Sequence, residues 1–153
     1  MRVLLQRVSR ASVTVRGERV AEIGPGLLLL VGVGKDDGFG EYDRLAEKVV
    51  NLRVFEDGQG KMNRSLAETG GDILVVPQFT LFGDVRKGRR PSWDAAAPPE
   101  IAADRVEAFA RALESRGPTV QRGAFREHME VELVNDGPVT LVIDAAELGE
   151  ARR

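Results

Sequence analysis

The sequence predicts a single-domain α/β fold, a layered sandwich of mixed or antiparallel β-sheets with two main helices. Three observations predict it. The chain has 153 residues, 42% of them hydrophobic, which suits one core and leaves little room for a second domain. Strand-like and helix-like periods alternate along it, with strands first, then helix, strands, helix and strands. The run LLLLVGV at residues 27–33 is continuous and apolar, as expected for a strand covered on both faces.

An opening hairpin is predicted by the first residues of the chain. Apolar residues alternate with polar ones toward the end of the segment 3–15, and Arg16-Gly17-Glu18 is a plausible turn. A short strand is expected at 19–23, and the apolar run at 27–33 then predicts a central strand.

Two stretches predict amphipathic helices, because their apolar residues recur at helical spacing. These residues are Tyr42, Leu45, Ala46, Val49 and Leu52 in the first stretch, and Ala102, Val106, Phe109, Ala110 and Leu113 in the second. Gly117-Pro118 ends the second helix. Strands are expected between the helices at 53–56 and 72–76.

Two strands are predicted to close the fold. Residues 129–133 alternate, residues 139–143 are mostly apolar, and Asn135-Asp136-Gly137-Pro138 between them has the composition of a turn. We expect one domain over residues 1–146 and a frayed tail at 147–153.

The composition excludes several kinds of chemistry. The chain has no cysteine and one histidine, His128, so thiolate nucleophiles and the usual metal and triad sites have too few residues. No segment approaches the ~20 apolar residues that span a membrane. Net charge is −2, which gives no global positive field for nucleic acid. We therefore expect a cytoplasmic protein without a metal or cofactor, and without membrane or DNA partners.

The stretch VVPQFTLFGD at 75–84 is the first candidate site. The predicted strand meets Pro77, which has no backbone N–H to donate to a sheet. Gln78, Phe79 and Thr80 follow, so an amide and a hydroxyl stand beside free backbone N–H groups. This is either a sheet edge or a ligand site.

The second candidate site is a loop that is rich in glycine, proline and arginine. Arg86, Lys87, Arg89 and Arg90 lie close together, with Trp93 nearby. Such a cluster can neutralise RNA phosphates beside an aromatic ring that stacks on bases. A solvated loop that keeps the protein soluble is an equally good interpretation.

Other motifs carry no function. GVGKDDGFG fails as a nucleotide loop, because Asp37 replaces the third glycine and Asp36 follows the lysine. Adjacent carboxylates such as these are usually solvated. His128 has no obvious partner and is interpreted as a surface strand residue. Most X-Pro peptide bonds in folded proteins are trans, so Gly137-Pro138 alone predicts an ordinary trans turn.

Taken together, the motifs resemble the D-aminoacyl-tRNA deacylase family. The likeness runs in order through MRVLLQRVSRASVTV, GLLLLVGV, GKMNRSL, GGDILVVPQFTL, RRPSW and VELVNDGPVTLVID. The two family signatures correspond to PQFTL at 77–81 and NDGPVT at 135–140, and Pro77 stands where the family usually has serine.

The resemblance implies the family's fold and a homodimer that acts on aminoacylated tRNA. It would hydrolyse D-aminoacyl esters, and also glycyl-tRNA mischarged on tRNA(Ala). Gly137-Pro138 of each subunit, with a cis peptide bond, would enter the partner's pocket and reject L-aminoacyl esters sterically. That implication overrides the base rate for a trans bond.

Site roles follow from the same resemblance. Gln78, Phe79 and Thr80 would form the catalytic segment, through backbone N–H groups and the Gln78 amide rather than a covalent Thr80 intermediate. Phe125 and Met129 would line an adenosine pocket, although both could equally be core residues. Arg86, Lys87, Arg89 and Arg90 would contact tRNA phosphates.

Pro77 leaves two alternatives open. A related branch with proline before glutamine implies a relaxed deacylase that acts on L-alanyl-tRNA or chiefly on glycyl-tRNA. A non-catalytic tRNA-binding module, which uses the basic loop alone, is the other alternative.

Overall fold

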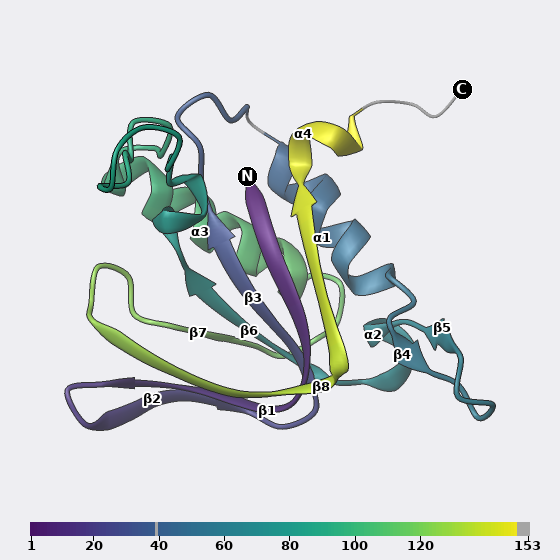
Figure 1. Cartoon of the computed structure of the whole chain (residues 1–153). Coiled ribbons are helices and arrows are strands. Elements are labelled where there is room, and N and C mark those ends of the chain that lie inside the picture. The colour runs from purple at the N-terminus through teal and green to yellow at the C-terminus, as the bar shows by residue number, and fades with distance from the viewer. Residues whose placement is uncertain (39, 150–153) are drawn as a thin grey trace.

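A six-stranded mixed sheet forms the centre of the computed structural model, which describes residues 1–38 and 40–149 (Figure 1). Its strands are β1 (Arg2–Val15), β2 (Glu18–Ile23), β3 (Gly26–Gly32), β6 (Asp72–Pro77), β7 (Val120–Arg122) and β8 (Met129–Asp144). The order is β2-β1-β3-β6-β7, and β8 pairs with β1. Pairs that include β1 are antiparallel, whereas β3–β6 and β6–β7 are parallel. The predicted α/β class is confirmed.

The opening hairpin and the central strand are also confirmed. β1 and β2 pair antiparallel across a turn in which Arg16 (φ 48°) and Gly17 (φ 79°) are left-handed. β3 lies between β1 and β6, and almost all of it is buried. Its continuous apolar run therefore reflects burial on both faces.

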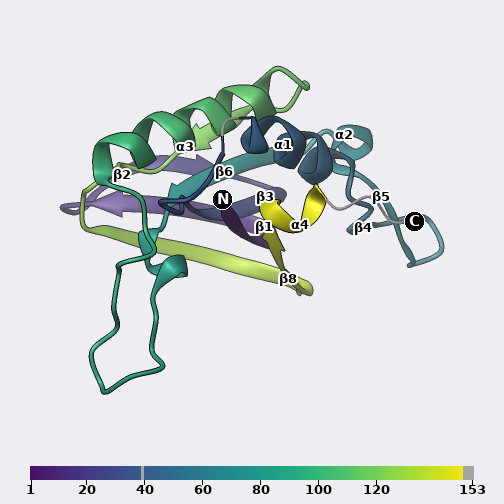
Figure 2. The same ribbon diagram turned by 90° about the horizontal axis from the view of Figure 1, so that it is seen from above.

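Two helices cover one face of the sheet. They are α1 (Glu41–Asn51) and α3 (Pro99–Glu114), which lie side by side above the strands (Figure 2). Their apolar stripes join a core cluster that includes Leu45, Phe109, Leu5 and Leu29. A second cluster lies between the strands on the other face and includes Val13, Leu28 and Leu74. The sandwich therefore has two cores on either side of one sheet.

Several short elements complete the chain. They are β4 (Phe55–Glu56), β5 (Met62–Arg64), α2 (Leu66–Thr69), the 3-10 helix η1 (Phe79–Phe82) and α4 (Ala145–Leu148). The frayed tail predicted at 147–153 is wrong for Glu147 and Leu148, which belong to α4, capped by Asp144. Residues 150–153 lie outside the described part of the chain.

The prediction of two separate closing strands is wrong. Residues 129–144 form one strand that pairs with β1, with register shifts on either side of Val8. The Asn135 amide spans the irregularity and donates to the carbonyls of Arg7 and Val139, at 3.0 Å each. Long-range pairing therefore overrides the local turn composition.

The predicted cis bond at Gly137-Pro138 is wrong as well. Among the described residues no peptide bond is cis. The trans form is favoured for X-Pro bonds in general. Here Gly137 accommodates the irregularity of β8 with φ at 107°, a value that side-chain-bearing residues rarely adopt.

Candidate active site

The candidate site begins where β6 ends. Pro77 is the last residue in register with β3, opposite Val31, and it has no N–H to extend the ladder. Gln78 N–H still donates to the Val31 carbonyl at 2.7 Å, and the chain then turns into η1. Regular pairing thus ends at Pro77, as predicted.

The turn leaves two backbone donors open. The first N–H groups of a helix have no acceptor within the helix. Among the described residues, the N–H groups of Phe79 and Thr80 donate to no backbone or side-chain acceptor. Gln78 Nε2 donates to the Thr80 hydroxyl, so these two side chains are held together beside the open donors.

Close packing fixes η1 against β3 and β1. A Cβ on Gly32, the last residue of β3, would lie 3.0 Å from the Phe82 ring, so glycine permits this approach. Arg2 donates to the Leu81 carbonyl at 2.8 Å, and its guanidinium carbon lies 4.6 Å from the centre of the Phe82 ring. Arg2 also lies 3.4 Å from Asp144. The two open N–H groups therefore sit on a turn held from several sides.

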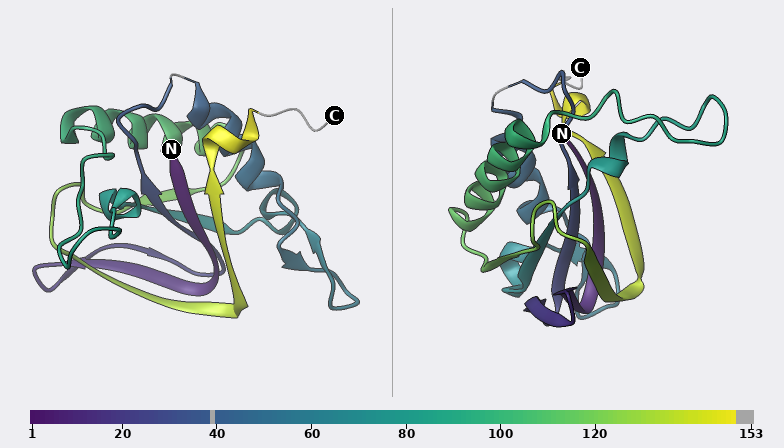
Figure 3. Two further views of the ribbon diagram at one scale, coloured as in Figure 1. Left: turned by 45° about the horizontal axis from the view of Figure 1, so that its top comes forward. Right: turned by 90° about the vertical axis from the view of Figure 1, so that its left-hand side faces the viewer.

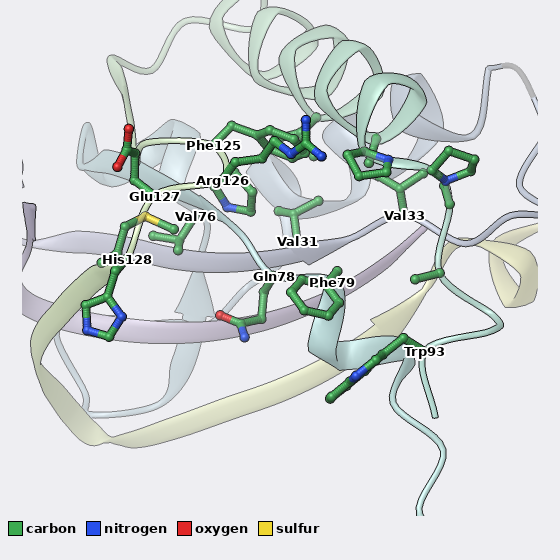
Figure 4. Close-up of a pocket in the computed structure, with 18 of the residues that line it drawn as sticks. Val31, Val33, Val76, Gln78, Phe79, Trp93, Phe125, Arg126, Glu127 and His128 are labelled. Atoms are coloured by element: carbon green, nitrogen blue, oxygen red, sulfur yellow. The ribbon is translucent and has the colours of Figure 1, made fainter. Parts of the chain in front are cut away.

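A pocket of about 740 Å³ opens beside this turn, at the ends of β3 and β6 and near the start of α3 (Figure 4). Apolar side chains line most of it, among them Val31, Val33, Val76, Ala102 and Val106. Glu127 and His128 lie on one side and Trp93 on the other, with Gln78 and Phe79 between them. An apolar pocket with a few polar groups is typical of a small-ligand site.

The pocket brings together four of the predicted residues. Gln78, Phe79, Phe125 and Met129 line it, whereas Thr80 does not. Met129 fits because Gly123 has no side chain, and a Cβ there would lie 2.9 Å from the Met129 sulfur. Phe125 also packs against the helix-side core, so its two predicted interpretations are compatible.

Sequence reasoning missed the polar rim of this pocket. Arg126, Glu127 and His128 line it, although His128 was expected to be an ordinary surface residue. His128 is exposed and directly precedes Met129 at the start of β8. That adjacency to a predicted pocket residue was the available signal.

The predicted basic cluster lies on a projecting hairpin, residues 84–92 (Figures 2 and 3). Asp84 and Ser92 close it with two backbone hydrogen bonds of 2.8 Å. The Arg86 guanidinium bonds to Asp84, 2.6 Å at the shortest, and lowers the pKa of that carboxyl to about 2. In the described chain, Lys87, Arg89 and Arg90 form no ion pair. The hairpin therefore offers three uncompensated cations.

Gly137 and Pro138 are exposed and do not line the pocket of their own chain. The buried Arg7 holds the segment, donating to the carbonyls of Asp136 (3.1 Å) and Val54 (2.7 Å). A Cβ on Gly137 would collide with the Arg7 guanidinium. Arg7 thus holds this segment in place, outside the pocket that the other predicted residues line.

Neither a metal cluster nor a membrane helix is found in the described residues. No group of three or more His, Cys, Asp or Glu side chains could hold a metal ion there. None of the described helices is long and apolar enough to cross a bilayer. Asp36 is exposed as expected, but Asp37 is half-buried and accepts from Gly34 N–H at 2.7 Å.

Comparisons with known proteins agree over nearly the whole chain. The family model described as D-Tyr-tRNA(Tyr) deacylase matches residues 4–144. The D-aminoacyl-tRNA deacylase of Thermomicrobium roseum is 60% identical over 148 residues, 97% of this chain and 96% of that protein. The Chloroflexus aurantiacus enzyme of the same name is 58% identical over 153 residues, 100% of this chain and 96% of that protein.

A solved structure gives the same picture of the fold. The structure titled c-Myc DNA Unwinding Element Binding Protein superposes with a TM-score of 0.88 at 39% identity. The match covers 94% of this chain and 98% of that one.

Proposed function

This chain belongs to the D-Tyr-tRNA(Tyr) deacylase family, and from that membership we propose that it hydrolyses D-aminoacyl-tRNA to D-amino acid and free tRNA. The observation that carries the proposal is the pocket at the end of β6, where the segment PQFTL, which corresponds to a family signature, leaves two backbone donors open. The enzyme is then a hydrolase of carboxylic esters.

The backbone of η1 supplies the proposed catalytic groups. The ester carbonyl oxygen accepts from the N–H groups of Phe79 and Thr80, which stabilise the negative charge that develops on it. The Gln78 amide lies beside them. An aminoacyl ester is already activated, so a positioned water and the neighbouring 2′-hydroxyl suffice without a covalent intermediate.

The apolar part of the pocket suits the terminal adenosine. Phe125 and Met129 offer an aromatic ring and a polarisable thioether on the wall that leads to β8. Outside the pocket, Lys87, Arg89 and Arg90, with Arg86, contact tRNA phosphates. Because the net charge of the protein is −2, its contact with RNA has to come from a local cluster of cations such as this one.

A second subunit completes the site. Gly137 and Pro138 are exposed, follow a carbonyl that Arg7 holds, and are absent from the pocket of their own chain, which supports their insertion into the pocket of a partner. Their carbonyls then accept from the substrate's α-ammonium and leave no room for an L side chain. Glycine has no side chain to exclude, so glycyl-tRNA, including glycine mischarged on tRNA(Ala), is also cleaved.

A relaxed deacylase is the second candidate, and Pro77 is the observation that favours it. Proline here replaces the serine usual in the D-specific family and lines the pocket beside Gln78. Such an enzyme would also cleave L-alanyl-tRNA.

One panel of esters tests both candidates. The hydrolysis rates of D-tyrosyl-, L-tyrosyl-, glycyl- and L-alanyl-tRNA are compared at the same low enzyme concentration. Rapid cleavage of the D and glycyl esters alone supports the main proposal. L-alanyl cleavage supports the relaxed enzyme, and stability of all four esters rejects both.

A further inference from the structure

We propose that Trp93 and the hairpin 84–92 form a binding surface for the single-stranded RNA directly upstream of the terminal nucleotide. Trp93 stacks on a nucleobase, and the hairpin cations contact the phosphates farther upstream along the RNA. This inference rests on the proposed function, because the RNA must enter the pocket with its aminoacylated end.

Trp93 has the geometry of a stacking platform. Its ring centre lies 5.1 Å from that of Phe79, with the planes at 72°, and Gly83 allows the indole to approach the backbone. A Cβ on Gly83 would lie only 2.7 Å from the ring. Trp93 is nevertheless 41% exposed. A ring that is held in place on one side and open on the other binds a base with little loss of side-chain freedom.

The position of Trp93 links the pocket to the hairpin. Trp93 lines the pocket together with Phe79, and it directly follows Ser92, which closes the hairpin with Asp84. A strand of RNA that leaves the pocket past Trp93 therefore meets the hairpin next. Lys87, Arg89 and Arg90 form no ion pair in the described chain, so their charges are available to phosphates.

RNA fits this surface better than a second protein does. Apart from Val85, the hairpin exposes mainly cations, and lysine is depleted in the cores of protein interfaces. A cluster of cations and an aromatic platform are the usual components of single-strand binding.

The fluorescence of the protein tests the stacking, because Trp93 is the one tryptophan in the sequence. An oligoribonucleotide that ends in CCA and carries no amino acid is expected to quench it saturably, whereas adenosine alone quenches much less. Absence of quenching by the oligonucleotide, or equal quenching by adenosine, would overturn the proposal.

Salt dependence tests the cations. Lys87→Gln is expected to reduce the magnitude of the log–log salt slope of oligonucleotide binding by about 0.7, the contribution of one contact to a single strand. Lys48→Gln removes the same charge from the exposed face of α1 and is the matched control. Equal slopes for both variants would contradict the proposed contact.

A pair of substrates separates this inference from the proposed function. Trp93→Ala is expected to lower kcat/KM for D-tyrosyl-tRNA about tenfold more than for 3′-O-D-tyrosyladenosine, and Trp93→Phe to restore most of that difference. Equal losses on both substrates would overturn the stacking role. The stacking role would also be overturned if the Trp93 variants changed the dissociation of the dimer and left the affinity for RNA unchanged. Failure of the wild-type protein to cleave either substrate would instead reject the proposed function.

Discussion

In the part of the chain that the structure describes, the side chains of the residues proposed to act on the ester have no acidic or basic partner. Gln78 and Thr80 bond to one another, and among the described residues no acidic or basic group forms a hydrogen bond to either of them. The open groups are the backbone N–H donors of Phe79 and Thr80, at the start of η1. The chemistry is therefore best tested by substitutions that remove a backbone N–H.

Phe79→Pro removes such a donor at a helix position that accepts proline. Phe79→Ala keeps the donor and loses only the ring, so it is the matched control. We expect kcat for D-tyrosyl-tRNA to be about 10²–10³-fold lower in Phe79→Pro than in Phe79→Ala, the effect of one oxyanion donor. Equal kcat values, with both variants folded by circular dichroism, would exclude the Phe79 N–H from catalysis.

Thr80→Ala is expected to retain at least about a tenth of the wild-type activity. The hydroxyl lies outside the pocket lining, and a side chain that transfers protons would contribute about 10²–10⁴-fold. A fall in kcat of less than about tenfold is therefore expected in single-turnover hydrolysis. An acyl-enzyme trapped on Thr80 would show that catalysis is covalent.

Gly137→Ala is expected to destabilise the fold. Gly137 has a φ of 107°, and an added Cβ would meet Arg7, which hydrogen bonds hold in place. The free energy of unfolding should fall by about 1–3 kcal/mol in urea titrations. Gly58→Ala, with no heavy atom within 4 Å of the added Cβ, is the control. Similar stability of the two variants would mean that the strain at Gly137 is relieved elsewhere.

At the scale of elements, one ion-pair cluster ties α3 to β7, the strand that leads toward Phe125. Arg122 bonds to Glu107 (2.9 Å) and to Glu114 (2.5 Å). These bonds lower the pKa of both carboxyls below the usual 4.5. Because the pKa values are lower in the folded state, the stabilisation is present above the unfolded pKa and is lost as pH falls through the folded values.

Arg122→Gln tests this cluster. Arg122 is 31% exposed, so we expect a loss of about 1 kcal/mol in the free energy of unfolding at neutral pH. The loss should shrink below about pH 4 as the carboxyls become protonated. Arg111→Gln, which removes a more exposed pair with Glu107, should cost less. A difference from wild type that does not change with pH would contradict the electrostatic origin.

Sequence periodicity predicted the elements whose burial is regular. The run at 27–33 corresponds to β3, and the two amphipathic stretches correspond to α1 and α3. Burial on both faces gives a continuous apolar run, and burial of one stripe gives apolar residues at helical spacing, so the sequence shows both patterns directly. β8 was predicted as two strands, since Asn135-Asp136-Gly137-Pro138 has local turn chemistry. Its pairing with β1 depends on residues more than a hundred positions away, which local composition does not record.

At the scale of the whole molecule, the pocket itself was only partly predictable. PQFTL marked one wall, because proline in a strand is an anomaly that a single segment reveals. A second wall comes from Arg126, Glu127 and His128, and the fold alone brings them near Gln78. Gly137 and Pro138 fall outside the pocket of their own chain, as residues contributed by a second subunit would.

Mixing two inactive variants tests most directly whether each active site is built from two subunits. Phe79→Pro damages the pocket, and Pro138→Arg places a bulky cation on the exposed segment meant for the partner. Equal amounts of the two chains, dissociated and reassociated, should recover about a quarter of wild-type D-tyrosyl-tRNA hydrolysis, because half of the random C2 dimers carry one intact site. Heterodimers that form but remain inactive, or a Pro138→Arg protein that is fully active and D-specific alone, would contradict a shared site.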